Sequence, residues 1–205
     1  MRRAASFTSL MLLICWAVFL IDQVLPKQNG YGTLLLAGAL IPTFVEQGQW
    51  YRLITSGFLH FNWPHIIFNS IALFQAGALV EYIYGTARYA TIYLAALLGG
   101  SVLAYITTAG SQTVTAGASG AIMGVFGAMA VLGLKLPPLR KELLQNAILP
   151  IVLTLGYGFS NPGISNAGHI GGVITGVIVA SLLHPARADE ILTAMGLADR
   201  GELSE

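Results

Sequence analysis

The stretch Thr115-Ala-Gly-Ala-Ser-Gly-Ala-Ile-Met-Gly124 places one serine, Ser119, among glycines and alanines at the expected start of a membrane helix. A second polar residue, His169, opens a later apolar segment within Asn166-Ala-Gly-His-Ile-Gly-Gly172. Serine among small residues is common where membrane helices pack closely. Taken alone, the stretch therefore favours packing over chemistry, and the rest of the chain has to decide between them.

The composition defines the class of protein. Hydrophobic residues make up 55% of the chain and charged residues 9%, and the mean hydropathy is +0.72. Soluble domains carry about 25% charged residues, so this is a polytopic membrane protein. The net charge of +1 gives no basic surface for nucleic acid. The single cysteine, Cys15, excludes an internal disulfide and a cysteine metal cluster. We expect neither a metal nor a cofactor.

Charge-free stretches give the number of membrane helices, because a span needs about 20 apolar residues. The stretches between Arg3 and Asp22 and between Arg52 and Glu81 hold one helix each. Two longer stretches, after Arg88 and after Glu142, hold two each. The expected spans are 7–25, 64–84, 88–108, 118–136, 142–160 and 167–184, within one membrane domain of residues 1–205.

The first apolar run resembles a signal peptide, since it follows Arg2 and Arg3. No Ala-x-Ala-like cleavage site comes after it; the chain continues Ile21-Asp-Gln-Val-Leu-Pro-Lys27. We therefore expect a retained first span.

Residues 26–63 separate the first two expected spans and contain the candidate for a seventh span. Their strongly apolar part, around Leu34-Leu-Leu-Ala-Gly-Ala-Leu-Ile41, is too short to span and is typical of an interfacial segment. Basic residues concentrate on the cytoplasmic side of membrane proteins. Six spans with the N-terminus inside place eight of the ten basic residues there: Arg2, Arg3, Arg88, Lys135, Arg140, Lys141, Arg187 and Arg200. We expect a multi-pass protein of the plasma (inner) membrane with both termini cytoplasmic and a long outer loop over 26–63.

Few polar residues lie within the expected spans, and intramembrane polar residues are functional hypotheses by default. His65 and Asn69 share one face of the second span, because residues four apart are helix neighbours. Ser119 and His169 open the fourth and sixth spans. All three of these spans enter from the outer side, so hydroxyl, imidazole and amide groups from distant segments reach the same depth.

The pairing of Ser119 with His169 suggests nucleophilic catalysis. A serine hydroxyl attacks well only when a base takes its proton. The only outer-side acids are Asp22 and Glu46, and neither belongs to the polar cluster. We therefore predict a Ser–His dyad in place of a triad.

An oxyanion must also be stabilised when the attacked carbon becomes tetrahedral. The backbone N–H of Ser119 at a helix N-terminus and the side chains of His65 and Asn69 are the candidate donors.

Glycines repeat every three or four residues in the fourth and sixth spans. They predict a close approach of the two helices, which would let a short serine side chain reach His169. The glycines are Gly120, Gly124 and Gly127 in one span and Gly168, Gly172 and Gly176 in the other.

Together these residues resemble the bacterial-type rhomboid family of intramembrane serine proteases, over about 50–183. The motifs that carry the resemblance, in order, are Trp50-Tyr-Arg52, His60, His65-x-x-x-Asn69, Gly77-x-x-x-Glu81-x-x-x-Gly85, Gly117-Ala-Ser-Gly120 and Ala167-Gly-His-x-x-Gly172. Each motif is weak alone, and all of them in this order are specific. Glu81 lies at the cytoplasmic end, where we expect a structural hydrogen-bonding role.

The resemblance implies an all-α, six-helix bundle with a water-filled cavity opening outward. It implies Ser119 as nucleophile, His169 as general base, and His65, Asn69 and the Ser119 amide as the oxyanion site. Implied substrates are single-span membrane proteins, cut near the outer part of the span after a small residue, within membrane lipids. The fifth span and residues 159–165 resemble a gate and cap. The oligomeric state stays open.

Four residues are expected to support the site: Gly117, Gly120, Met123 and Gly172. Many relatives carry an aromatic residue four positions after the serine, where this chain has Met123. A methionine can pack on an imidazole edge, and we expect activity with an altered rate.

Two other functions compete with a peptidase. One is a catalytically impaired relative that binds membrane clients. The presence of both dyad residues, Ser119 and His169, argues against it. The other is a proton-coupled transporter that uses His65 and His169, but the expected spans carry no chain of ionisable residues through the bilayer, and the His65–His169 cluster stops at one depth. The chain has no His-Glu-x-x-His motif for a metalloprotease, and only Asp22 is available to an aspartyl intramembrane protease.

Overall fold

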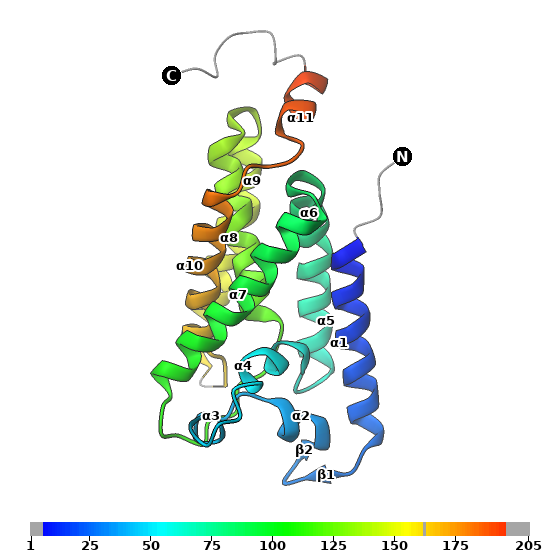
Figure 1. Ribbon diagram of the computed structural model, residues 1–205, viewed down its shortest axis with the longest axis vertical. Helices are drawn as coiled ribbons and strands as arrows, with labels where there is room; N and C mark the ends of the chain where they lie inside the picture. Colours follow the sequence, from blue (N-terminus) through cyan, green and yellow to red (C-terminus); the bar gives the residue numbers. More distant parts are fainter. Residues whose placement is uncertain (1–5, 162, 196–205) are drawn as a thin grey trace.

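A computed structural model describes residues 6–161 and 163–195 of the chain. Its long helices form a bundle, with the short elements of the first loop gathered at one end (Figure 1). The helical segments of the bundle are α1 (Ser6–Val24), α5 (Trp63–Ala72) continued by the π-helical turn η2 (Leu73–Gly77) and α6 (Ala78–Tyr84), α7 (Thr86–Thr107), α8 (Ser119–Lys135), α9 (Arg140–Ser160) after the 3-10 turn η3 (Pro137–Leu139), and α10 (Asn166–Leu182). The predicted all-α membrane bundle is confirmed.

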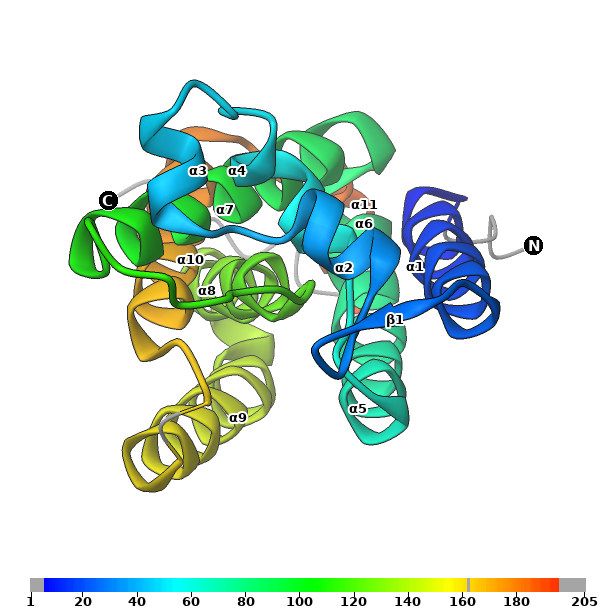
Figure 2. The ribbon, with the colours of Figure 1, turned by 90° about the horizontal axis from the view of Figure 1, so that it is seen from below.

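Four helical segments are long and apolar enough to cross a membrane: Ser6–Val24, Trp63–Tyr84, Thr86–Thr107 and Pro137–Ser160. The helices α8 and α10 are also apolar but have only 17 residues each. Seen from the loop end, α8 is central, with α10, α7, α9 and α5 around it (Figure 2). A central helix can be short because protein, rather than lipid, covers it.

The first loop contains no long helix. After α1 it forms a hairpin of β1 (Lys27–Gln28) and β2 (Tyr31–Gly32), in which Lys27 pairs with Gly32 and Gln28 with Tyr31. Four short helical elements follow: α2 (Thr33–Gly38), α3 (Pro42–Glu46), α4 (Arg52–Thr55) and the 3-10 turn η1 (Ser56–Phe58). The longest of them has 6 residues and cannot span a bilayer.

Arg52 holds this loop together from inside. Its guanidinium donates to the carbonyl oxygens of Leu36, at 2.9 Å, and Ala39, at 2.7 Å, and its Nε donates to Gln49 Oε1 at 2.7 Å. The side chain is buried, so each hydrogen bond compensates for lost hydration. The loop is therefore a folded platform.

Glu81 organises the opposite end of the bundle. Its carboxylate accepts hydrogen bonds from the backbone N–H groups of Phe7, at 3.0 Å, and Thr8, at 2.9 Å, and from the hydroxyls of Thr8 and Thr86. A carboxylate at a helix N-terminus satisfies free amides and complements the helix dipole. Glu81 thus joins the starts of α1 and α7, in keeping with the structural role expected of it.

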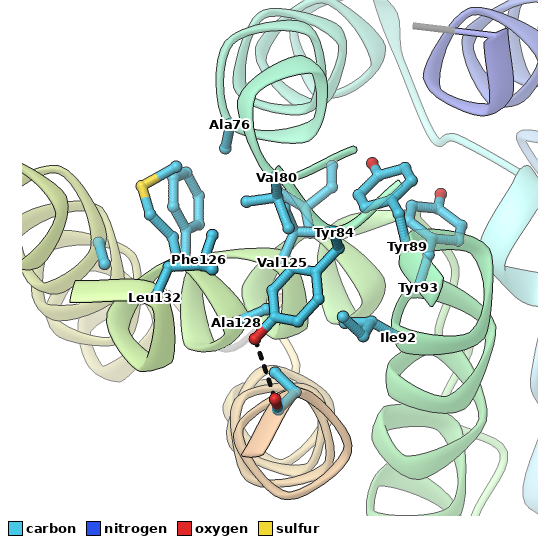
Figure 3. Close-up of a cluster of buried hydrophobic side chains, with 14 of the residues drawn as sticks. Ala76, Val80, Tyr84, Tyr89, Ile92, Tyr93, Val125, Phe126, Ala128 and Leu132 are labelled. Carbon is cyan, nitrogen blue, oxygen red and sulfur yellow. Dashed lines mark hydrogen bonds between the residues drawn. The ribbon is translucent and has the colours of Figure 1, made fainter. Parts of the chain in front are cut away.

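Tyrosines fill the core between α6, α7 and α8. Tyr84, Tyr89 and Tyr93 pack with Val125 and Ala128 of α8 (Figure 3). The Tyr84 hydroxyl donates to the Ala180 carbonyl oxygen of α10 at 2.9 Å, the bond drawn as a dashed line. This contact fixes α10 against α6 at the end away from the first loop.

The chain leaves α10 for a short final helix, α11 (Ala188–Ala194). In Figure 1, α11 and the start of α1 lie at the end opposite the first loop. Of the basic residues expected on the cytoplasmic side, Arg2, Arg3 and Arg200 lie outside the described residues, as does the tail beyond 195.

Candidate active site

Ser119 is the first residue of α8, and the first loop fixes the segment that leads to it. Leu40 and Thr115 form an antiparallel bridge with two backbone hydrogen bonds of 2.9 Å. Gly117 N–H donates to the Ser56 carbonyl oxygen at 2.9 Å. Gly117 has a φ of +132°, a conformation that favours glycine. The turn before Ser119 is thus held on both sides.

His169 lies in the first turn of α10 and reaches Ser119. The helix begins under a capping hydrogen bond, since Ser165 Oγ accepts from Gly168 N–H at 3.1 Å. His169 is buried, and its Nε2 is 2.8 Å from Ser119 Oγ. This is a hydrogen bond of ordinary length. The predicted neighbours Ser119 and His169 are therefore brought together.

Glycines allow this contact because α8 and α10 meet backbone to backbone. A Cβ on Gly172 would overlap the carbonyl oxygen of Gly120, and a Cβ on Gly176 would overlap that of Gly124. A Cβ on Gly120 would lie 3.3 Å from the Gly168 carbonyl oxygen. The approach expected from the glycine spacing is present, and it extends from the Ser–His pair into the bundle.

His65 and Asn69 face the same turn from α5. A Cβ on Gly117 would lie 2.7 Å from His65 Nε2 and 3.6 Å from Asn69 Nδ2. The helix α5 starts at a capped position, because Asn62 Oδ1 accepts from His65 N–H at 3.0 Å. Asn69 Nδ2 is buried and has no hydrogen-bond partner among the described residues. An unpartnered amide donor therefore lies beside the turn that precedes Ser119.

His60 supports His65 from the first loop. The two imidazoles meet edge to face with ring centroids 5.0 Å apart, and the ring of Phe61 stacks on His65 with a centroid distance of 5.8 Å. Burial, together with the neighbouring His65, lowers the pKa of His60 to about 3. His60 is therefore neutral near pH 7 and packs on His65 without repelling it.

The carboxylates of Asp22 and Glu46 bind backbone N–H groups of loops and loop helices. Asp22 Oδ1 accepts from Leu34 N–H at 2.7 Å at the start of α2, and Glu46 Oε1 accepts from Gly110 N–H at 2.8 Å. Within residues 6–161 and 163–195, nothing hydrogen-bonds the buried Nδ1 of His169. No third member of a triad is found in that part of the chain.

Met123, one turn after Ser119, is buried in the main apolar core with Ile122 and Phe126. Within the described part of the chain, no three His, Cys, Asp or Glu side chains are grouped to hold a metal ion.

Sequence reasoning missed the partners of the turn before Ser119. Leu40 and Ser56 contact it through backbone atoms alone, so their side chains give no signal. Gly117 gave the only indication, since a glycine beside a candidate nucleophile is typical of a constrained turn.

The fold and the site define a class: multi-pass helical membrane proteins in which a serine at the start of one buried helix is hydrogen-bonded to a histidine on its neighbour. Residues 47–186 match the family model described as "Rhomboid domain". The chain belongs to the rhomboid family.

Curated relatives agree with this family. The chain is 37% identical to the rhomboid protease GluP of Bacillus subtilis over 87% of its own length and 35% of that protein. It is 34% identical to RHOMBOID-like protein 5 of Arabidopsis thaliana, over 74% of the chain and 50% of the relative. It is 32% identical to the rhomboid protease AarA of Providencia stuartii, over 86% of the chain and 72% of the relative. The chain thus spans about a third of the first relative and half of the second.

Proposed function

We propose that this protein is an intramembrane serine endopeptidase that cleaves single-span membrane proteins with a Ser119–His169 dyad. The observation that carries the proposal is the 2.8 Å separation of His169 Nε2 and Ser119 Oγ. Nucleophile and base within hydrogen-bond reach are the signature of an activated serine. Relatives named rhomboid proteases support the same activity.

In the proposed reaction His169 Nε2 takes the proton of Ser119 Oγ as the oxygen attacks the carbonyl carbon of the scissile peptide bond. The carbon becomes tetrahedral and its oxygen becomes negative. His169 then returns the proton to the leaving nitrogen, the C–N bond breaks, and an acyl-enzyme ester remains on Ser119. Water, deprotonated by His169, hydrolyses the ester and restores the hydroxyl.

The negative oxygen needs donors fixed in advance. Ser119 N–H lies at the first position of α8, where an amide has no partner within the helix. Asn69 Nδ2 and the His65 ring lie beside the preceding Gly117. We assign these three groups to the oxyanion site, with Gly117, Gly120, Met123 and Gly172 supporting it.

Replacing Asn69 with alanine should lower kcat for reporter cleavage by roughly 10²–10³-fold, because one removed oxyanion donor has about this effect. KM should change little, since the donor acts on charge that develops after binding. The measurement is initial-rate kinetics with a single-span reporter in liposomes. Equal changes in kcat and KM, or no change, would remove Asn69 from the oxyanion site.

Membership of the rhomboid family supports a proposal for the substrate class. We propose transmembrane segments cleaved near their outer end after a small residue, in a water-filled cavity that opens outward. We also propose α9 with residues 159–165 as gate and cap, of which residue 162 lies outside the described residues. The support for a gate is that α9 leaves Val152, Leu153, Tyr157 and Phe159 exposed.

The location proposed is the plasma membrane, with both termini cytoplasmic and residues 1–205 forming one membrane domain. The support is that α1 begins, and α11 lies, at the end of the bundle opposite the first loop.

A fluorophosphonate probe tests the function independently of the substrate. It forms a covalent bond only with an activated serine oxygen, so we expect a mass adduct on Ser119 and none on the loop serine Ser111. His169→Ala should abolish the adduct because no base then takes the proton. Absence of labelling in the folded parent would reject the peptidase and favour the client-binding alternative.

A further inference from the structure

The face of the bundle formed by α1 and α5–η2 contains a polar group that the fold leaves unpartnered. A hollow of about 380 Å³ lies there, lined by Leu12, Trp16, Ser70, Ile71, Phe74 and Gln75. The two helical segments run side by side in Figures 1 and 2. This surface lies on the α1 side of α5, whereas α9 lies on the other side (Figure 2).

Two of the three polar side chains that line the hollow satisfy each other. Trp16 Nε1 donates to Ser70 Oγ at 2.9 Å, and Ser70 Oγ donates to the Ile66 carbonyl oxygen at 2.7 Å. The third, Gln75, is exposed, and its carboxamide forms no hydrogen bond with another described residue.

Gln75 lies on the outward face of the π-helical turn. Within η2, Phe74 and Gln75 are both exposed and Ala76 and Gly77 are both buried. A Cβ on Gly77 would lie 2.5 Å from the Tyr89 hydroxyl, so this glycine must face α7. Gln75, two residues earlier in the same turn, is exposed on the outside of the bundle.

Gln75 is also deep in the bilayer. It is the thirteenth residue of the 22-residue segment Trp63–Tyr84, about 18 Å from its outer end at 1.5 Å per residue. The hydrocarbon core is about 30 Å thick. Acyl chains offer no hydrogen-bond partner there, and lipid headgroups do not reach this depth. The carboxamide therefore needs a protein partner.

We propose that this face, Leu12, Ile71, Phe74 and Gln75, binds a second copy of the chain. A carboxamide has both a donor and an acceptor, so two copies of Gln75 related by a two-fold axis satisfy each other with two hydrogen bonds. Exposed Ile71 and Phe74 flank Gln75 with apolar contact area. The dimer axis passes near Gln75, and α9 stays free on the other side of α5.

The self-association of the parent in liposomes, measured by energy transfer between labelled copies at several protein-to-lipid ratios, tests this interface. Gln75→Leu should raise the dimer dissociation constant about tenfold, the loss expected for interhelical hydrogen bonds in a membrane. Gln75→Asn should restore part of the affinity. Gln112→Leu, in the exposed loop before α8, is the matched control and should leave the constant unchanged. A monomeric parent, or an equal constant for Gln75→Leu, would overturn the proposal.

A second measurement does not depend on the folding of Gln75 variants. In a Cys15→Ala background, Phe74→Cys should form a disulfide between copies, and Leu153→Cys on exposed α9 should not. Cross-linking at Leu153→Cys alone would place the interface elsewhere and reject this face. Neither measurement involves proteolysis. A monomeric protein would therefore leave the proposed peptidase activity standing, and an inactive protein would leave the proposed dimer standing.

Discussion

Ser119→Ala should reduce cleavage of a single-span reporter in liposomes by at least about 10⁴-fold, the scale seen when a serine protease loses its nucleophile. The variant keeps His169 and the proposed oxyanion donors but has no side-chain oxygen to form the acyl-enzyme. Its fold should be unchanged, because Ser119 lies among small residues and alanine removes only the hydroxyl. The measurement is product formation per enzyme over hours, with thermal unfolding in detergent confirming the fold.

Two controls separate the nucleophile from other effects of mutation. Ser111→Ala, in the loop before α8, should cleave at the parent rate. Asp22→Asn should stay within a few-fold, because the Asp22 carboxylate accepts from Leu34 N–H and caps a short helix of the first loop. Full activity of Ser119→Ala would reject the dyad. A loss of several orders of magnitude with Asp22→Asn would instead indicate a third catalytic residue.

The helical bundle could be predicted because a membrane imposes a simple rule on sequence. Charges are excluded from the hydrocarbon core, so charge-free stretches delimit the helices. Even the two 17-residue helices, α8 and α10, were found in this way. Polar residues at membrane depth are rare for the same reason, and this singled out Ser119 and His169 before any geometry was known.

The first loop could not be predicted beyond its length. Its supports, the Leu40–Thr115 bridge and the bond from Gly117 N–H to the Ser56 carbonyl, are backbone contacts between distant segments. Any residue can make such contacts, so no residue type marks them. The shape of the loop also depends on buried Arg52, whose partners are three groups of the same loop.

The π-helical turn in the second span was equally hidden. The apolar pattern of 64–84 is that of one continuous helix, whereas the π-helical turn Leu73–Gly77 ends at a glycine that lies against Tyr89. The contact between Gly77 and Tyr89 is packing against α7, which is tertiary information.

Gly172→Ala should be the most damaging small change away from the reacting atoms. The added methyl group would overlap the carbonyl oxygen of Gly120, which belongs to the backbone of α8 and cannot rotate away. Overpacking of a rigid contact costs about 3 kcal/mol, the upper end of the usual range, which lowers Tm by roughly 6–12 °C in a chain of this size. Thermal unfolding in detergent measures the shift.

The same change should reduce catalysis in the molecules that remain folded. Moving α10 away from α8 lengthens the contact between His169 and Ser119, and a displacement of about 1 Å can cost on the order of 10² in rate. Gly156→Ala is the matched control, because a Cβ at Gly156 of α9 meets nothing within 4 Å. It should keep both Tm and turnover. If Gly172→Ala behaves like Gly156→Ala, the helices do not meet through their backbones, and the 2.8 Å contact must be maintained by something other than the glycines.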